Sequence, residues 1–325
     1  MKKKRKLNTL YNNFTDYYKI HYKIGDGKIC TVYLCSKLKT NTKYAVKVIE
    51  DKYLECGIYE FNSLKSMQNI NNSIKVYENY IYNNKYCFVL EYIDLTLENV
   101  INFDKYLDIY LIKQICKQLL EYLNSIHTFI IHTDIKPDNI LFNKYNLSVK
   151  LIDYGNANNL SEIKQNYTYE PQVINYKSPE IIMGLPYHQS IDIWSLGCVI
   201  IELVTKEQLF NKSTDNFDHL KNIIELFGYP SNYLIEKMNI NKRNKFFYKK
   251  KNKYIINESL LKTVYSGVFD TYIKKNCMSK IINTSEIKEL NNNKLFNSFI
   301  NKFFIIDPNK RWTAKMLLSH NFLQK

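Results

Sequence analysis

The chain has 325 residues, of which 45% are hydrophobic, enough for a sizeable core shared by two lobes. We expect no membrane anchorage, because no apolar run approaches the roughly 20 residues of a membrane-spanning helix and no signal peptide precedes residue 20. The seven cysteines include no CxxC pair, which is typical of free thiols in a reducing compartment.

The formal net charge is +15, and most of the lysines and arginines are dispersed along the chain. This dispersion favours a lysine-rich solvated surface over a nucleic-acid-binding or anionic-surface-binding protein, so direct nucleic-acid binding is not expected. The exception is the run Lys-Lys-Lys-Arg-Lys at residues 2–6. It is either a nuclear import signal or part of a charged tail over residues 1–19. We expect a cytoplasmic and/or nuclear location.

Residues 20–93 predict a small β-rich lobe. Four segments have the alternating or continuous apolar residues typical of strands: 20–24, 31–35, 44–49 and 86–92. The first two flank a glycine-containing turn. One helix is expected at about 53–67, between the strands.

Residues 94–325 predict a larger helical lobe, joined to the first by a hinge near 91–95. Apolar residues recur at helical spacing over 111–126. Residues 191–204 are apolar nearly all round, which indicates a buried central helix. An insert rich in Asn and Lys is expected at about 211–290. The predicted fold class is therefore α+β, with two lobes.

The turn between the first two strands reads Gly-Asp-Gly-Lys-Ile-Cys-Thr-Val over residues 25–32. It has the first two glycines of a GxGxxGxV loop, with Cys30 in the third glycine position. Glycines between two strands let the backbone approach phosphate oxygens closely. Taken alone, the motif is weak and favours a simple hairpin turn.

Lys47 shares one face of its strand with Ala45 and Ile49, so its ammonium group needs a partner. Glu60 lies on the same helical face as Leu64, and a buried unpaired carboxylate would be costly. An ion pair between Lys47 and Glu60 solves both problems and directs the lysine toward nucleotide phosphates. The alternative is that both are unrelated surface residues.

The segment His-Thr-Asp-Ile-Lys-Pro-Asp-Asn at 132–139 carries the strongest chemical signal. Asp153, in the tripeptide Asp-Tyr-Gly, follows Asn139 by fourteen residues. Phosphoryl transfer needs this set. Asp134 would orient the attacking hydroxyl and Lys136 would hold the γ-phosphate. Asn139 and Asp153 would bind magnesium.

In order and spacing, these motifs resemble those of eukaryotic protein kinases over about residues 20–322. Further matching motifs are Ser-Pro-Glu at 178–180, Asp-Ile-Trp-Ser-Leu-Gly at 192–197 and Asp-Pro-Asn-Lys-Arg at 307–311. The resemblance implies a bilobal protein-kinase fold, ATP and Mg²⁺ as cofactors, and serine/threonine specificity through Lys136. It also implies an ion pair between Glu180 and Arg311 that braces the large lobe.

The resemblance also places the nucleotide between the lobes. Leu90 would line the back of the pocket, while backbone groups of Glu91 and Ile93 would meet the adenine edge. The full set of expected nucleotide-site residues is Ile24, Gly25, Gly27, Val32, Ala45, Lys47, Leu90, Glu91, Ile93, Asn139, Leu141 and Asp153.

Finer features resemble the SR-protein kinases of the CMGC group. They are Thr133 in place of the usual Arg, Gly-Asn-Ala at 155–157, and the insert sequences at 218–228 and 246–250. The resemblance implies phosphorylation of serine in Arg/Ser-rich protein segments by a monomer. It also implies an acidic docking groove, here at Glu207, Asp218 and Glu225. The alternative is that these three are ordinary surface acids on helices.

Several residues depart from the family pattern. Tyr154 stands where Phe or Leu is usual, so its hydroxyl needs a partner. Val173, Ile174 and Lys177 replace residues that commonly contact the catalytic groups or the substrate, which leaves specificity open. Thr133 cannot hold a phosphate on the activation segment, and Glu170 stands where related kinases carry a phosphotyrosine or an acid. We therefore predict activity without phosphorylation of the activation segment, although Tyr167, Thr168 and Tyr169 are candidate sites.

Three alternatives remain at this point. The first is another CMGC branch, resembling the dual-specificity or LAMMER kinases. The second is a pseudokinase acting as a binding scaffold, which the complete set of catalytic residues disfavours. The third is a nucleic-acid-binding module, supported only by the positive net charge and the basic run at residues 2–6.

Overall fold

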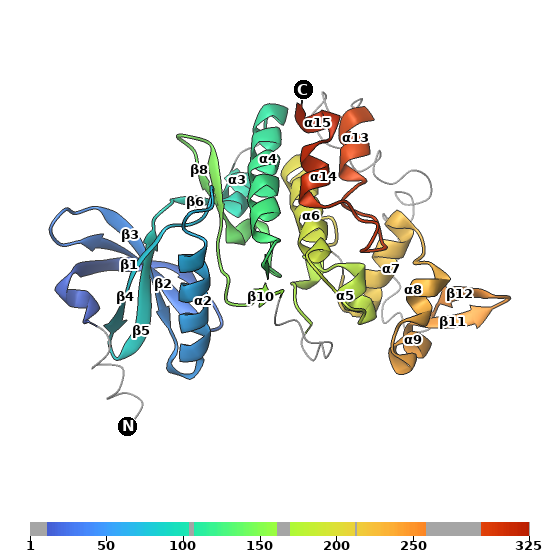
Figure 1. Cartoon of the computed structure of the whole chain (residues 1–325), viewed down its shortest axis with the longest axis horizontal. Coiled ribbons are helices and arrows are strands. Elements are labelled where there is room, and N and C mark those ends of the chain that lie inside the picture. Colours follow the sequence, from blue (N-terminus) through green and yellow to red (C-terminus); the bar gives the residue numbers. More distant parts are fainter. Residues whose placement is uncertain (1–11, 104–106, 161–169, 212, 258–293, 325) are drawn as a thin grey trace.

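The computed structural model describes residues 12–103, 107–160, 170–211, 213–257 and 294–324. It has two lobes, a small one built on a sheet and a larger helical one (Figure 1). The expected α+β architecture is confirmed. Among the described residues, no helix is long and apolar enough to cross a membrane. The basic run at residues 2–6 lies outside the described residues, so the import signal stays a prediction.

The small lobe is a five-stranded antiparallel sheet with the order β1-β2-β3-β5-β4. Its strands are β1 (Tyr18–Asp26), β2 (Cys30–Lys37), β3 (Lys43–Ile49), β4 (Val76–Tyr82) and β5 (Lys85–Glu91). A short 3-10 turn, η2 (Asp51–Tyr53), leads from β3 into helix α2 (Leu54–Ser66), which packs against β4 and β5. At Gly57 on this helix, a Cβ atom would lie 2.6 Å from Ile49, so glycine permits the close approach of α2 to the sheet.

The start of the small lobe differs from the expected tail at residues 1–19. Phe14, in the 3-10 turn η1 (Phe14–Asp16), is fully buried and stacks on Tyr18 with 5.0 Å between ring centroids. Asn13 forms a bridge to Ile81 on β4. The residues just before β1 therefore pack onto the sheet, because their aromatic rings complete a core on its outer face.

The large lobe begins with a three-stranded sheet of β6 (Leu95–Thr96), β8 (Ile140–Asn143) and β9 (Ser148–Leu151). A second pair joins β7 (Ile130–Ile131) to β10 (Asn158–Asn159). Two short 3-10 turns, η3 (Pro137–Asn139) and η4 (Ile174–Tyr176), flank the site described below. The remaining helices and strands of this lobe are α3 (Leu97–Phe103), α4 (Ile109–Ile126), α5 (Pro179–Met183), α6 (Ser190–Thr205), α7 (Asn216–Phe227), α8 (Asn232–Glu236), α9 (Ile240–Phe246), β11 (Phe247–Lys250), β12 (Lys253–Ile256), α13 (Lys294–Ile300), α14 (Ala314–Leu318) and α15 (Asn321–Gln324).

Helix α6 is the centre of the large lobe, as its uniformly apolar sequence predicts. All but the last of its residues are buried, and it contacts α3 and α4 (Figure 1). At Gly197 an added Cβ would lie 2.7 Å from the Cβ of Phe303, so only glycine allows this contact. The helix thus provides a fixed support for the loops that approach its N-terminal end.

The expected pair between Glu180 and Arg311 is present and fully buried. The two guanidinium nitrogens of Arg311 lie 2.7 and 2.9 Å from the two carboxylate oxygens of Glu180. Arg311 also donates to the Ser190 carbonyl, 2.9 Å away, and its guanidinium lies 5.0 Å from the ring centre of Trp194. The pair therefore ties α5 and the C-terminal region to α6.

The insert expected at about 211–290 is described in its first half only. Helices α7, α8 and α9 and the hairpin β11–β12 occupy residues 216–256, and residues 258–293 lie outside the described part. The hairpin projects from the end of the large lobe furthest from the small one (Figure 1).

Candidate active site

Lys47 is held by two carboxylates from different parts of the fold. On β3, its Nζ lies 2.6 Å from Oε1 of Glu60 on α2 and 2.8 Å from Oδ1 of Asp153. Burial opposes the charged form of Lys47, but Glu60 and Asp153 raise its pKa, so the ammonium stays protonated. Burial likewise opposes ionisation of Asp153, yet Lys47 keeps the pKa of that carboxyl low. The expected Lys47–Glu60 pair is present and also reaches Asp153.

The expected nucleotide-site residues of the small lobe share one face of the sheet. Val32 pairs directly with Lys47 across β2 and β3, and Ala45 pairs with Leu90 across β3 and β5. Residues opposite each other in an antiparallel pair point to the same side. These apolar side chains therefore lie beside the ammonium of Lys47, where a nucleotide base and its phosphates would meet.

A backbone hydrogen bond closes the glycine-containing turn between β1 and β2. Gly27 donates its N–H to the Cys30 carbonyl at 2.8 Å, and a Cβ at Gly27 would lie 3.3 Å from the Cys30 sulfur. Gly25 stands opposite Val32 in the β1–β2 pairing. Side-chain-free backbone is thus exposed next to Lys47, as the approach of a phosphate requires. Ile24, which precedes it, is 40% exposed.

The connection between the lobes starts where β5 ends. The Glu91 N–H donates to the Lys75 carbonyl at 2.9 Å, and the Glu91 carboxylate pairs with Lys150 on β9. Ile93 follows in the connection and is half-buried, as is Leu141 on β8. The hinge is therefore tied to both lobes through Glu91, and the contact of Glu91 and Ile93 with the adenine edge stays a prediction.

Residues 132–139 form the catalytic loop, and Asp134 contacts two other polar residues of this loop, Lys136 and Asn139. Oδ2 of Asp134 accepts hydrogen bonds from Lys136 Nζ and Asn139 Nδ2, both at 3.0 Å. Asn139 also donates to the Asp134 carbonyl at 2.8 Å. Both contacts use the same carboxylate oxygen, which leaves Oδ1 to accept a proton from another hydroxyl.

Asp192 on α6 binds the backbone at the start of the catalytic loop. Its two oxygens accept the N–H groups of His132 at 2.8 Å and Thr133 at 2.9 Å. Thr133 has a φ of 70°, a left-handed backbone conformation that costs a non-glycine residue free energy. Asp153 has the same left-handed conformation, with a φ of 69°. The buried carboxylate of Asp192 stabilises the strained loop next to the reacting groups.

Asn139 and Asp153 lie side by side, because the Asn139 carbonyl accepts the N–H of Ile152 at 2.9 Å. The Asn139 amide nitrogen is used by Asp134, which leaves its oxygen for a ligand, and Asp153 is bonded to Lys47 through one oxygen. Two oxygen donors of this kind fit Mg²⁺, which proteins bind with few carboxylates plus substrate phosphates. The described residues contain no cluster of three His, Cys, Asp or Glu that would form a protein-only metal site.

The hydroxyl of Tyr154 has the partner that its position demands. It donates to the hydroxyl of Tyr122 on α4 at 2.6 Å, and Tyr122 donates to the sulfur of Met67, next to α2, at 3.6 Å. Burial raises the pKa of Tyr154, so the phenol stays neutral. This chain of contacts links Asp153 to the helix that carries Glu60. The position of Asp153, the expected magnesium ligand, is thereby coupled to that of α2.

Thr133 and Glu170 both have partners within the chain, as activity without phosphorylation of the activation segment would require. The Thr133 hydroxyl donates to the Asn156 carbonyl at 2.8 Å. The carboxylate of Glu170 contacts Lys242 of α9 at 2.8 Å, Asn216 of α7 at 2.6 Å and Lys177 at 3.5 Å. Partial burial opposes its ionisation, but Lys242 lowers the pKa of Glu170, so the acid is charged. Tyr167, Thr168 and Tyr169 lie outside the described residues.

We expect a Glu170→Ala variant to lose roughly tenfold in kcat/KM, because Lys177 and Lys242 would face each other without an anion. Treatment of the wild-type protein with a phosphatase should leave its rate unchanged. The control is Glu236→Ala, which should leave kcat/KM unchanged. Glu236 is a half-exposed acid of the insert that pairs with Lys249 at 3.5 Å. A phosphatase-treated enzyme without activity would contradict this assignment of Glu170.

Three of the residues noted as departures lie between Glu170 and α5. Val173 is 43% exposed, and Ile174 begins the turn η4. Gln172, with a φ of 72°, bonds Ser195 and the N–H of Ser178. The segment is thus held by its glutamine, while Val173 stays open to a substrate.

Two of the three expected docking acids have local partners. Asp218 accepts the N–H of Thr214 at 3.0 Å, and Glu225 pairs with Lys221 at 3.4 Å on the same helix. Glu207 is exposed just beyond α6. Asp218 therefore has a local partner just before α7 and Glu225 has one on α7, and these partners compete with a substrate for the two carboxylates. The docking groove itself stays a prediction.

A second acidic group, which the sequence analysis did not single out, lies beside the catalytic loop. A hydrogen bond between the carboxyl groups of Glu98 on α3 and Asp138 on η3 raises the pKa of Glu98 to about 7. Both side chains are exposed. Glu202 of α6 also acts on Glu98 and accepts the Tyr176 hydroxyl at 2.7 Å. Forty residues separate Glu98 from Asp138, so no sequence motif connects them.

Residues 18–323 match the protein kinase domain family. The chain belongs to the protein kinase family. It is 29% identical to the dual specificity protein kinase YAK1 of Saccharomyces cerevisiae, over 93% of this chain and 41% of that protein. It is 30% identical to the serine/threonine-protein kinase prpf4B of Dictyostelium discoideum, over 95% of this chain and 40% of that protein. This kinase chain thus spans about two fifths of the length of either relative.

Among solved structures, the crystal structure of the PF14_0431 kinase domain matches with a TM-score of 0.80 and 26% identity, covering 95% of both chains. The bilobal protein-kinase fold is therefore confirmed. The named relatives are kinases of the CMGC group, so the prediction of that group holds. They do not show a similarity to the SR-protein kinases in particular, and that finer resemblance stays a prediction.

Proposed function

We propose that this kinase domain is an active, Mg-ATP-dependent serine/threonine protein kinase. The observation that carries the proposal is the connected set in which Lys47 bonds Glu60 and Asp153, and Asp134 bonds Lys136 and Asn139. A scaffold that merely binds a partner has no need for this geometry. The arrangement supports catalysis over the scaffold alternative.

Each residue has a defined task in this proposal. Mg-ATP supplies the phosphoryl group when bound. Lys47 holds the α- and β-phosphates, with its charge maintained by Glu60. Asp134 accepts the proton of the substrate hydroxyl through its available oxygen, and Lys136 offsets negative charge on the γ-phosphate. The protein thereby orients the groups and stabilises charge, which is most of what phosphoryl transfer requires.

For the substrate, we propose serines in arginine-rich protein segments, as the sequence analysis predicts. The acids at Glu98, Asp138 and Glu202 support this, because they place negative charge next to Lys136 and the phosphoacceptor position. Two carboxyl groups that share a proton would release it in favour of a guanidinium, which can bond both at once. Asp218 and Glu225 contribute less, since Thr214 and Lys221 already bond to them, and Glu207 stays exposed.

The proposed activity is tested by transfer of radiolabelled phosphate from Mg-ATP to an Arg/Ser-repeat peptide and to its Lys/Ser counterpart. Labelling of the Arg peptide above the Lys peptide is expected, with Asp134→Asn as the inactive control. Equal labelling of both peptides would retain the kinase and discard the arginine preference. A third peptide with Tyr in place of Ser tests the dual specificity carried in the name of the YAK1 relative. No labelling of any peptide would favour the scaffold.

The shared proton predicts a pH dependence. Because the pKa of Glu98 is raised to about 7, the carboxyl is largely neutral below pH 7 and ionised above it. The KM for an Arg-containing peptide should therefore fall as pH rises from about 6 to about 8. In Glu98→Gln that change should flatten, with kcat retained. Glu55→Gln, an acid of the same charge on the small lobe, serves as the control. A pH profile unchanged by Glu98→Gln would exclude Glu98 from substrate recognition.

A further inference from the structure

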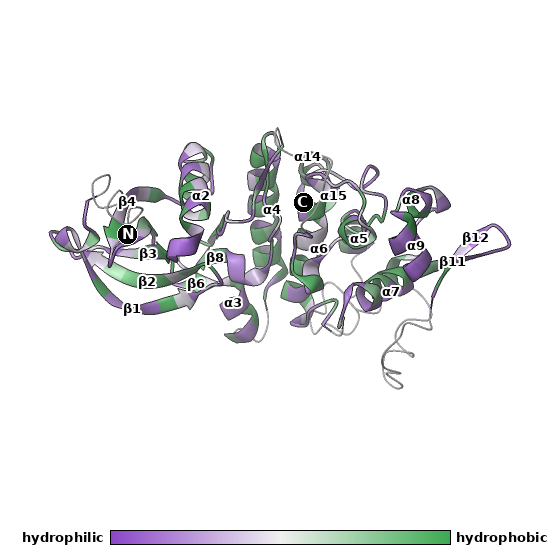
Figure 2. Ribbon diagram, turned by 90° about the horizontal axis from the view of Figure 1, so that it is seen from below, coloured by the Kyte–Doolittle hydropathy of each residue, from purple (hydrophilic) through white to green (hydrophobic). Residues whose placement is uncertain are grey.

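Residues 237–257 form the most basic part of the described chain. They contain eight Lys or Arg residues and no Asp or Glu, in a protein whose net charge is +15. The segment covers α9 and the hairpin β11–β12, at the end of the large lobe away from the nucleotide cleft (Figure 1). The outer part of the hairpin is coloured hydrophilic in Figure 2. Charge of one sign is thus concentrated on one projecting element.

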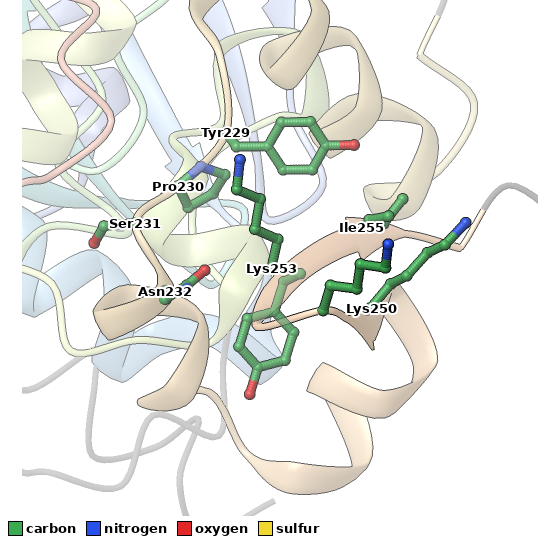
Figure 3. A pocket seen from close by; sticks show the side chains of 9 residues that line it. Tyr229, Pro230, Ser231, Asn232, Lys250, Lys253 and Ile255 are labelled. Atoms are coloured by element: carbon green, nitrogen blue, oxygen red, sulfur yellow. The ribbon is translucent and has the colours of Figure 1, made fainter.

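A hollow of about 880 Å³ lies between this hairpin and the loop that joins α7 to α8. Figure 3 shows Tyr229 and Pro230 on the loop side and Lys250, Lys253 and Ile255 on the hairpin side. Its wall is therefore largely apolar or aromatic, with Ser231 and Asn232 as polar members, and lysines stand at its edge. This composition is typical of a site for a ligand with an apolar part and a negative part.

The lysines at the edge are available for binding. Lys250, Lys251 and Lys253 are exposed, and none of them forms an ion pair with another residue of the described chain. Their neighbour Lys249 differs, since it pairs with Glu236 and lies 5.3 Å from the ring centre of Tyr254. Three ammonium groups on one turn repel one another, and an anionic partner would relieve that repulsion.

The hollow favours a peptide over a single-stranded nucleic acid. Single-stranded nucleic acids bind by stacking successive bases on several aromatic rings. The described lining has two rings, and the ammonium of Lys249 already lies 5.3 Å from the ring centre of Tyr254, so Tyr229 alone is open to stacking. The hairpin is a sheet of two strands, in which α9 contacts β11 and α8 contacts β12, and both strands contribute residues to the hollow. An extended acidic peptide can lie across the end of the hairpin and present carboxylates to Lys250 and Lys253.

We propose that this hollow is a docking site for an acidic segment of a partner protein, separate from the catalytic cleft. An apolar side chain of the segment would sit against Tyr229 and Pro230, and Asp or Glu residues on either side would meet Lys250 and Lys253. The alternative is that the lysines only protect an edge strand from pairing with other chains. In that case no ligand of defined chemistry would bind.

The test measures binding directly, without ATP, so its result is independent of the proposed kinase activity. A fluorescein-labelled short peptide of Asp and Glu around a central Leu is titrated with the full chain, and anisotropy is recorded. Lys250→Glu combined with Lys253→Glu should weaken binding by about tenfold or more. The same charge change at Lys39 and Lys43, two exposed lysines of the small lobe, should have little effect.

Two further arms separate specific docking from general attraction. Tyr229→Ala should weaken binding several-fold through loss of the apolar contact, whereas Tyr145→Ala should not, since Tyr145 is 88% exposed elsewhere. A labelled oligouridine replaces the peptide in parallel. Binding of oligouridine in place of the peptide would overturn the proposal in favour of nucleic acid. Equal loss in both lysine variants, or no binding, would also overturn it. An unchanged circular-dichroism spectrum and melting temperature would show that the variants are folded.

Discussion

Replacement of Asp134 by Asn is expected to lower kcat by roughly 10²–10⁴-fold while ATP still binds. The Asn side chain fits the same space, but it cannot accept the proton of the substrate hydroxyl. It also removes the charge that Lys136 and Asn139 contact at 3.0 Å. The KM for ATP should change little, because Lys47 and the glycine turn lie on the opposite side of the cleft.

The measurement is steady-state phosphate transfer, accompanied by nucleotide binding and thermal melting of the same preparation. Asp16→Asn makes the same chemical change on an exposed turn of the small lobe and should leave the rate intact. If Asp134→Asn retained more than about a tenth of the wild-type rate, general-base catalysis by this residue would be excluded.

The sequence predicts well those features that depend on neighbouring residues. The alternation over 44–49 and the apolar residues of 191–204 correspond to β3 and α6. The ion pair of Lys47 and Glu60 was also predictable, since each side chain is polar on an otherwise apolar face. In these cases the pattern of residues within a short segment is enough to predict which side chains are buried and which need a partner.

The sequence predicts poorly those features that join distant segments. Strand β4 was not predicted, because Val76–Tyr82 contains polar residues that face solvent at a sheet edge. The contact of Glu170 with Lys242 spans 72 residues, and that of Glu98 with Asp138 spans forty. Neither can be found by spacing within a motif, since only the folded lobe places these residues together.

The docking acids show the limit of inference from a resemblance. Asp218 and Glu225 are acidic at the expected positions, and this agreement suggested a groove. In the fold, the carboxylate of Asp218 accepts the N–H of Thr214, and Glu225 pairs with Lys221. A residue type at a given position therefore does not determine whether its charge is available, because local partners compete for it.

Breaking the buried pair of Glu180 and Arg311 is expected to cost about 3–5 kcal/mol of the free energy of unfolding. In Arg311→Met the carboxylate of Glu180 stays buried without its bidentate partner, and the Ser190 carbonyl loses a donor. The melting temperature of the large lobe should fall by about 10 °C. Differential scanning calorimetry measures this directly.

The neighbouring residue offers a matched control. Lys310→Met removes a charge from a side chain that is 78% exposed and lies 3.8 Å from Asp307, so it should change stability by less than about 1 kcal/mol. The double variant Glu180→Met with Arg311→Met should recover part of the loss, since no buried charge is left unpaired. If Arg311→Met melted within about 1 °C of wild type, the pair would not brace the lobe. A large loss that the double variant partly restores would instead show that the buried charge, more than the lost packing, makes Arg311 necessary.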